Sequence, residues 1–181
     1  MALAATVHRV EIALSDVDRG VYESLELRLA RHPSESARYL LTRTLAYCFE
    51  YEEGIAFSKG GLSSTDEPPV SVRDATGALV AWIDVGAPSA ERLHKASKAA
   101  ARVAVYTHDE APVRREAAAR AIHRVEEIAV WRVDSALLDA MEAMLAKTTK
   151  LEIARNDGRV YVTHDGRVVE GEIARVSLAT P

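Results

Sequence analysis

Strict alternation of apolar and polar residues marks the start of the chain. Every second residue is apolar from Val10 to Leu14 and again from Leu25 to Leu29, on either side of the turn-like run Asp16-Val-Asp-Arg-Gly20. A period of two places alternate side chains on one face of a strand. The pattern therefore predicts an N-terminal β-hairpin over residues 6–30.

Helical periodicity replaces the alternation after Pro33. Apolar residues then recur every three or four positions, which predicts a helix from about Ser34 to Glu52 with one buried face. The single cysteine, Cys48, falls in that apolar stripe, so we expect a small core residue rather than a reactive thiol. Similar patterns and capping residues predict three more helices, at about 89–101, 112–123 and 134–147.

A second hairpin follows the first helix. Val70–Arg73 and Leu79–Val85 flank the turn Asp74-Ala-Thr-Gly77, and the latter segment is apolar at alternate positions on both faces, as in a central strand covered by helices. Further strands are predicted at about 55–58, 102–107 and 128–133, and a β-meander over 149–178. We therefore predict a single α/β (α+β) domain over 1–181, with a mixed central β-sheet flanked by helices.

Composition and charge narrow the classes of function. The chain has 181 residues, 48% of them hydrophobic and 28% charged, with a formal net charge of −4. Such a protein lacks the broad positive field that drives sequence-independent nucleic-acid binding, so any such contact needs a local basic strip. No signal peptide and no apolar run of about 18 residues is found, which predicts a cytoplasmic protein without membrane contact.

Acidic residues at the second hairpin form the strongest chemical candidate. A turn centred between Ala75 and Thr76 would put Glu67 opposite Asp84 and Asp66 opposite Val85. Opposed residues of an antiparallel pair have Cβ atoms about 5 Å apart, which is close enough for two carboxylates to share one cation. The hairpin therefore makes Asp66, Glu67 and Asp84 candidate ligands of a metal ion.

Asp84 ends an apolar strand, where an unpaired carboxylate is costly to bury, so it needs a partner. One alternative is Arg92 or a backbone N–H at the start of the following helix. The other is a divalent metal held together with Asp66 or Glu67. The same helix carries a basic strip, Arg92, Lys95, Lys98 and Arg102, which is either a solvated face or a surface for a phosphate backbone.

Several strings resemble the YaeQ family of bacterial proteins, in family order and along nearly the whole chain. They are Met1-Ala-Leu-Ala-Ala-Thr, Leu29-Ala-Arg-His-Pro-Ser-Glu35, Asp66-Glu-Pro68, Trp82-Ile-Asp-Val-Gly86, Glu91-Arg-Leu-His-Lys-Ala96 and Val103-Ala-Val-Tyr-Thr107. The resemblance implies a variant of the PD-(D/E)XK nuclease fold, in which a helix, a three-stranded meander, a second helix and a further strand form the core. Here that core would span about 34–107.

The resemblance also implies site residues. Asp66 and Asp84 match the two acids that bind Mg²⁺ in the wider superfamily, and Glu35 matches an acid of the first helix. The lysine expected two residues after the second acid is replaced by Gly86, so Lys95 or Arg92 would have to supply the cation. Glu35 is also explained by the helix macrodipole alone, and regular helix geometry would turn it toward solvent.

Two functions follow from these expectations. The first is a Mg²⁺-dependent nuclease or phosphodiesterase, with Asp66, Asp84, Lys95 and Glu35 as catalytic residues and Arg92, Lys95 and Lys98 binding nucleic acid. The second is a non-catalytic adaptor that keeps a nuclease-like scaffold and binds nucleic acid or an unidentified protein. The missing lysine and the negative net charge are compatible with the second.

Overall fold

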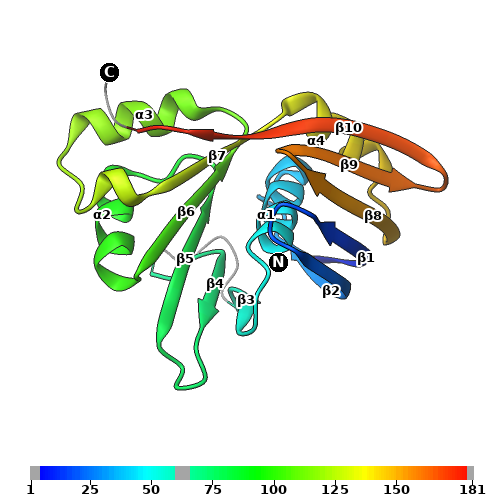
Figure 1. Cartoon of the computed structure of the whole chain (residues 1–181), viewed down its shortest axis with the longest axis horizontal. Helices are drawn as coiled ribbons and strands as arrows, with labels where there is room; N and C mark the ends of the chain where they lie inside the picture. The colour runs from blue at the N-terminus through cyan, green and yellow to red at the C-terminus, as the bar shows by residue number, and fades with distance from the viewer. Residues whose placement is uncertain (1–4, 60–65, 179–181) are drawn as a thin grey trace. The chain divides into compact units, whose positions relative to one another are not determined.

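A computed structural model describes residues 5–59 and 66–178 (Figure 1). Residues 1–4 of the N-terminal string and Ser63–Thr65 of the loop before the second hairpin lie outside the described residues. The chain divides into two compact units. Unit 1 comprises Met1–Leu41 and Val133–Ile173, and unit 2 comprises Thr42–Arg132 and Ala174–Pro181. Whether the chain acts as one domain stays a prediction.

Unit 1 is built on five strands in the order β2-β1-β8-β9-β10. Their bounds are β1 (Thr6–Asp16), β2 (Val21–Arg31), β8 (Thr148–Asn156), β9 (Arg159–His164) and β10 (Arg167–Val176). The β1–β2 hairpin and the β8–β9–β10 meander are antiparallel, as predicted, whereas β1 runs parallel to β8. The predicted hairpin and meander are therefore confirmed, and a parallel pairing joins them.

Helix α4 (Ser135–Met144) packs closely on this sheet. Its residues Leu137, Leu138 and Met141 are buried. A Cβ atom at Gly171 of β10 would lie 2.7 Å from the Cβ of Leu137, which is shorter than real contacts allow. The missing side chain of Gly171 is thus what lets α4 approach the strand.

Two turns of unit 1 are tied together by Asp18, which lies between β1 and β2. Its carboxylate accepts hydrogen bonds from the backbone N–H groups of Gly158 (3.0 Å) and Asp157 (2.6 Å) in the turn between β8 and β9. These hydrogen bonds lower the pKa of Asp18 below its ordinary value of 3.8. The charged form therefore stabilises the folded state.

We predict that Asp18→Asn removes an acid-sensitive part of the stability. Because the folded-state pKa is depressed, this part is fully present above the unfolded-state pKa and is lost as the pH falls through the folded-state value. The free energy of unfolding, measured by urea titration from pH 2.5 to 7, should differ most between wild type and variant above about pH 5, and the difference should shrink progressively as the pH falls from about 4 toward 2.5. A constant difference over the whole range would contradict the prediction.

Unit 2 has the strand order β7-β6-β5-β4-β3. The strands are β3 (Ile55–Phe57), β4 (Val70–Arg73), β5 (Leu79–Val85), β6 (Arg102–Thr107) and β7 (Ala129–Val133). Strands β3, β4 and β5 form an antiparallel meander, and β5, β6 and β7 run parallel. Each parallel step is bridged by a helix, α2 (Ala90–Ala99) and α3 (Glu110–Ala119). The meander and the β5–α2–β6 step occur in the order of elements that the hydrophobic pattern predicts.

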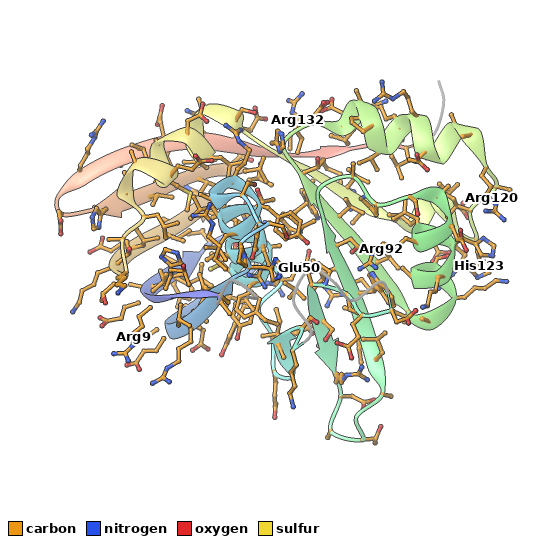
Figure 2. All side chains as sticks on the ribbon, turned by 180° about the vertical axis from the view of Figure 1, so that it is seen from behind. Arg9, Glu50, Arg92, Arg120, His123 and Arg132 are labelled. Carbon is orange, nitrogen blue, oxygen red and sulfur yellow. The ribbon has the colours of Figure 1, made fainter. Side chains whose placement is uncertain are left out.

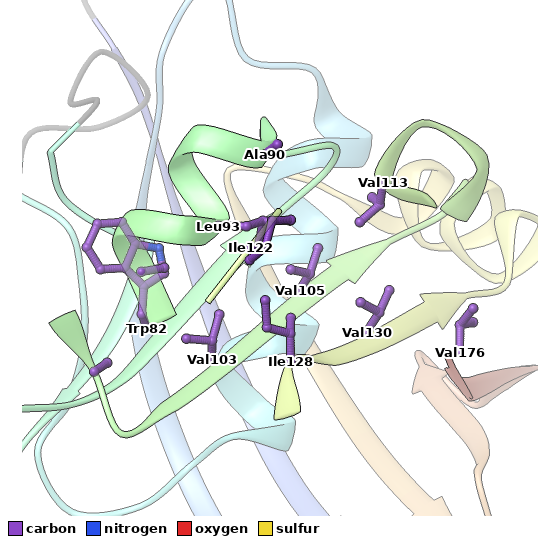
Figure 3. Packing of buried hydrophobic residues seen from close by; sticks show 12 residues of the cluster. Trp82, Ala90, Leu93, Val103, Val105, Val113, Ile122, Ile128, Val130 and Val176 are labelled. Carbon is purple, nitrogen blue, oxygen red and sulfur yellow. The ribbon is translucent and has the colours of Figure 1, made fainter. Parts of the chain in front are cut away.

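Helices α2 and α3 cover one face of this sheet, where a cluster of buried residues lies between them and the strands (Figure 3). Leu93 of α2 and Val113 of α3 face Val105 and Val130 of the strands, and all four side chains are fully buried. The cluster is mostly aliphatic, in keeping with an aromatic content of only 6% for the whole chain. It fixes α2 against β5 and β6, and thereby fixes the charged side chains that α2 carries.

Helix α1 (Ala37–Phe49) begins in unit 1 and continues in unit 2. In unit 2 it buries Leu45, Cys48 and Phe49, which confirms Cys48 as a core residue. The chain then turns at Gly54, where the backbone φ is +89° and a Cβ atom would lie 1.9 Å from the carbonyl oxygen of Arg73. Only glycine fits this position, because the collision is with backbone.

The helices are shorter than predicted. Helix α1 begins three residues later than expected and α4 ends three residues earlier, and the predicted 112–123 helix is Glu110–Ala119 followed by a short 3₁₀ turn, Val125–Glu127. The alanine-rich helical pattern of the sequence continues past the end of α3, but the backbone at Arg120 is extended, so the helix ends there. None of the helices in the described ranges has the length and apolar character needed to cross a membrane.

Candidate functional site

Asp84 lies at the carboxyl end of β5 and is 2% exposed. Arg92, in the first turns of α2, forms a bidentate ion pair with it. Nε of Arg92 lies 2.9 Å from Oδ1 and 3.0 Å from Oδ2, and a terminal guanidinium nitrogen lies 2.8 Å from Oδ1. Trp82 donates its Nε1–H to Oδ2 at 2.8 Å. Arg92, one of the partners that the sequence suggests for Asp84, is therefore its ion-pair partner in the structure.

The local sequence explains this geometry. Trp82 and Asp84 are two residues apart on a strand, so both side chains point to the face that α2 covers. Ser89 caps α2 by accepting a hydrogen bond from the backbone N–H of Arg92, which fixes the start of the helix. The guanidinium carbon of Arg92 lies 5.3 Å from the centre of the Trp82 ring, a cation–π contact. Figure 2 shows Arg92 projecting from α2 toward the strands of unit 2.

Burial and hydrogen bonding act in opposite directions on this carboxyl group. Burial raises the pKa of Asp84, and the hydrogen bonds from Arg92 and Trp82 oppose that rise. The contacts with Arg92 and Trp82 therefore offset part of the cost of burying this carboxyl group. At the end of β5, the carboxylate of Asp84 thus accepts hydrogen bonds from both Arg92 and Trp82.

Asp66 and Glu67 lie in the loop before β4 and are exposed. Lys95 of α2 forms an ion pair with Asp66, and this hydrogen bond lowers the pKa of Asp66. Glu67 accepts a hydrogen bond from the hydroxyl of Ser58 at 3.1 Å, and its backbone carbonyl accepts one from Arg92 at 2.9 Å. Helix α2 therefore holds Asp84 through Arg92, and it holds the acidic loop through both Arg92 and Lys95.

The register predicted for the second hairpin was wrong by two residues. Val70 pairs with Ile83 and Ser71 with Trp82, so the ladder stops at Val70, one residue after the two prolines. Neither Asp66 nor Glu67 is in the ladder. Two features moved the register: the turn closes through a hydrogen bond from the backbone N–H of Asp74 to Ala78, and the ladder has an irregularity at Val72–Arg73.

Glu35 lies in unit 1, in the turn before α1, and is 3% exposed. Its Oε2 accepts a hydrogen bond from the backbone N–H of His32 at 3.1 Å. The expectations of a solvent-facing side chain and of a first-turn helix acid were wrong, because α1 starts two residues later, after a cap formed by Ser36. Glu35 closes its own turn instead.

The basic strip is largely engaged within the protein. Arg92 and Lys95 bind acidic groups of unit 2, and Lys98 is exposed on α2. Arg102, which the sequence groups with this strip, is the first residue of β6 and forms ion pairs with Glu50 and Glu52. Of the four cations, Arg102 therefore belongs to a different set of contacts.

The contacts of Arg102 with Glu50 and Glu52 were not predicted from the sequence. Just after α1, Glu50 is 7% exposed and accepts a hydrogen bond of 2.9 Å from the hydroxyl of Tyr106, as well as the ion pair of 2.6 Å from Arg102. Tyr106 is fully buried and alternates in β6 with the residues that face α2, so this network lies on the other face of the sheet. The acidic run after Phe49 was the available signal, but a charge run usually indicates solvent.

The residues present do not fit a Mg²⁺ ion. Among the residues that the structure describes, no group of three or more His, Cys, Asp or Glu side chains is arranged to hold a metal. The oxygens of Asp84 already accept N–H donors, and Mg²⁺ prefers carboxylate, carbonyl and water oxygens with free lone pairs. The structure does bring the three candidate metal ligands close to one helix, α2. Asp84 and Asp66 pair with its cations Arg92 and Lys95, and the backbone carbonyl of Glu67 accepts a hydrogen bond from Arg92.

The fold and this site define a class: a mixed α/β protein in which a strand-end carboxylate is neutralised by an arginine of the next helix. The chain belongs to the YaeQ family. The family described as "YaeQ protein" matches residues 1–173.

Similar proteins agree with this assignment. "Uncharacterized protein YaeQ" of Escherichia coli (strain K12) is 29% identical over 173 residues, covering 94% of each chain, and its Salmonella typhi counterpart is 28% identical over 165 residues, covering 90% of this chain and 91% of the relative. The crystal structure of YaeQ protein from Xanthomonas axonopodis pv. citri has a TM-score of 0.85 at 31% identity, covering 96% of this chain and 98% of the other. That from Pseudomonas syringae has a TM-score of 0.84 at 30% identity, covering 96% of each. The mixed α/β fold is therefore that of the family.

Proposed function

We propose that this chain is a non-catalytic, protein-binding adaptor that retains a nuclease-like scaffold. The observation that carries the proposal is the closed pairing of Asp84 with Arg92 and Trp82. A carboxylate with three donated hydrogen bonds is a structural acceptor, and a divalent ion would have to displace a bidentate guanidinium that also binds the carbonyl of Glu67. Asp84 then stabilises the junction of β5 and α2 instead of holding a metal.

The engaged state of the basic strip supports a protein partner over nucleic acid. Arg92 and Lys95 are already paired with Asp84 and Asp66, which leaves Lys98 as the one of these three α2 cations without an ion pair among the described residues. The net charge of −4 adds repulsion toward a phosphate backbone. A partner with mixed surface charge is compatible with both facts.

A metal-dependent phosphodiesterase is the second candidate, and one arrangement favours it. Arg92 and Lys95 are three residues apart on α2, so they hold Asp84 and the Asp66 loop against the same helical face. Loss of both cation contacts would be required before the two acids could serve as ligands. No chemical step is assigned to this candidate, because the present donor set does not fit the metal.

Calorimetry with Mg²⁺ and Mn²⁺ separates the two candidates. Wild type and Asp84→Asn should both show no binding at millimolar metal concentrations, and neither should cleave single- or double-stranded DNA or RNA. Fluorescently labelled DNA and RNA of 20 nucleotides should not bind at physiological salt. Metal binding and cleavage that are both lost in Asp84→Asn would overturn the adaptor proposal in favour of the phosphodiesterase, and tight salt-dependent binding without cleavage would replace the protein partner with nucleic acid.

A further inference from the structure

Strand β2 forms one edge of the unit 1 sheet. It is eleven residues long, from Val21 to Arg31, and pairs only with β1 among the described strands. An edge strand presents a row of backbone N–H and C=O groups that can pair with another strand. Long edges are normally blunted by bulges, proline or inward charges, but the central segment of β2 alternates regularly, with Leu25, Leu27 and Leu29 buried and the residues between them exposed.

The exposed face of the hairpin has an unusual charge arrangement. Arg9 of β1 is directly opposite Arg28 of β2, and Glu11 is directly opposite Glu26. Like charges in directly opposed positions destabilise an antiparallel pair. Figure 2 shows Arg9 pointing away from the strands. The hairpin thus places equal charges against each other twice in succession.

Of these two acids, Glu11 has a compensating cation among the residues that the structure describes and Glu26 does not. Glu11 forms an ion pair of 3.0 Å with Lys150 on β8. Within the described part of the chain, Glu26 and Arg28 have no ion pair and no side-chain hydrogen bond. Both residues belong to the edge strand β2, and no described strand pairs with its outer side. Their missing partners would therefore come from a strand added at that edge.

A second copy of β2 supplies those partners in one register. When two copies of β2 pair antiparallel, directly opposed residues point to the same face of the sheet. The leucines of both copies therefore share one face only if each odd-numbered residue lies opposite an odd-numbered residue, and all other registers are excluded. With Leu27 opposite itself, Glu26 of each copy lies opposite Arg28 of the other. Pairing centred on Glu26 or on Arg28 would instead oppose two equal charges at the axis.

The same register agrees with the rest of the strand. Leu25 falls opposite Leu29 of the second copy, so the apolar face continues across the junction. Glu23 falls opposite Arg31, which adds a second complementary pair on each side of the axis. Nine residues of each strand, 23–31, are paired. Burial therefore restricts the pairing to registers that keep the leucines on one face, and charge selects the register centred on Leu27 among them.

We propose that two copies of this chain associate through antiparallel pairing of their β2 strands about a two-fold axis at Leu27. This extends the sheet across the junction by β-augmentation. The interaction is independent of the proposed function. It is specified by charge, so the dimer dissociates as the salt concentration rises.

Charge reversal tests the proposal by sedimentation velocity at low salt, over 1 to 300 µM protein. Wild type should form a concentration-dependent dimer. Glu26→Arg alone and Arg28→Glu alone should each weaken it at least tenfold, since each opposes equal charges across the axis. The double variant Glu26→Arg/Arg28→Glu should dimerise like wild type, and an equimolar mixture of the two single variants should form a heterodimer.

A loss of folding stability is not expected to explain a weaker dimer in these variants. Each single reversal removes a like-charge pair within the hairpin, because the new arginine faces Glu11 and the new glutamate faces Arg9. Thermal unfolding should therefore show single variants at least as stable as wild type. As a matched control, Glu152→Lys on the exposed face of β8, which is not an edge strand, should leave the dimer unchanged. A wild type that stays monomeric at all concentrations, or single variants that dimerise as well as wild type, would overturn the proposal.

Discussion

Arg155→Met should be among the most destabilising single substitutions in unit 1, lowering the free energy of unfolding by about 3–5 kcal/mol. Arg155 of β8 lies opposite Asp16 at the end of β1 and forms two hydrogen bonds with it, from Nε to Oδ1 at 2.9 Å and from a terminal nitrogen to Oδ2 at 2.6 Å. Asp16 is fully buried and Arg155 is 6% exposed. Without the guanidinium, Asp16 is left as a buried carboxylate with no counter-charge.

Urea unfolding of four proteins measures this effect: wild type, Arg155→Met, Asp16→Asn and the double variant. Because a buried pair is worth less than the cost of breaking it, the double variant should be more stable than Arg155→Met alone. Arg159→Met is the matched control, since its partner Glu170 is exposed and that ion pair lies on the surface. Equal losses in Arg155→Met and the control would show that Asp16 does not depend on Arg155.

The second large effect is expected at the candidate site. Arg92→Met should lower the free energy of unfolding by about 2–4 kcal/mol, because it leaves Asp84 buried without its cation and removes the contacts with Trp82 and the carbonyl of Glu67. Arg92 is partly exposed, which places the expected loss below that of Arg155.

The pH dependence of the Arg92→Met variant gives an independent check. With the cation gone, burial raises the pKa of Asp84 against only the hydrogen bond from Trp82, so the folded state binds a proton that the unfolded state has released. The deficit relative to wild type should therefore grow as the pH rises from 5 to 8. Adding Asp84→Asn should remove this growth, and Lys95→Met, at an exposed ion pair, should change stability little. A deficit independent of pH would mean that Asp84 is not the source.

These two expectations bear on the function as well as on the fold. If Arg92 is required for stability through Asp84, the strand-end carboxylate is a structural group, which is what the adaptor proposal needs. If Arg92→Met is as stable as wild type and binds Mg²⁺ where wild type does not, the carboxylate is available for a metal. The same variant therefore separates a structural ion pair from a masked ligand.

Local pattern determined most of the elements. Period-two alternation found β1 and β2, apolar runs with turn residues between them found β4, β5 and β6 at their observed bounds, and helical spacing found α1, α2 and α4 with shifted ends. These signals lie within a few neighbouring residues, because side-chain direction in a strand or helix is fixed by the backbone period alone. The sequence also singled out Asp84 correctly as a buried acid that needs a partner.

Tertiary structure decided the partners. The register of β4 on β5 depended on a turn hydrogen bond and an irregularity that composition does not encode, and a shift of two residues took the acidic loop out of the ladder. The parallel pairing of β1 with β8 joins residues more than 130 positions apart, so the Asp16–Arg155 pair had no local signal. Likewise, Glu35 became buried because the chain turns before α1 begins. Charge–charge contacts act over distances in space, and only the folded chain sets those distances.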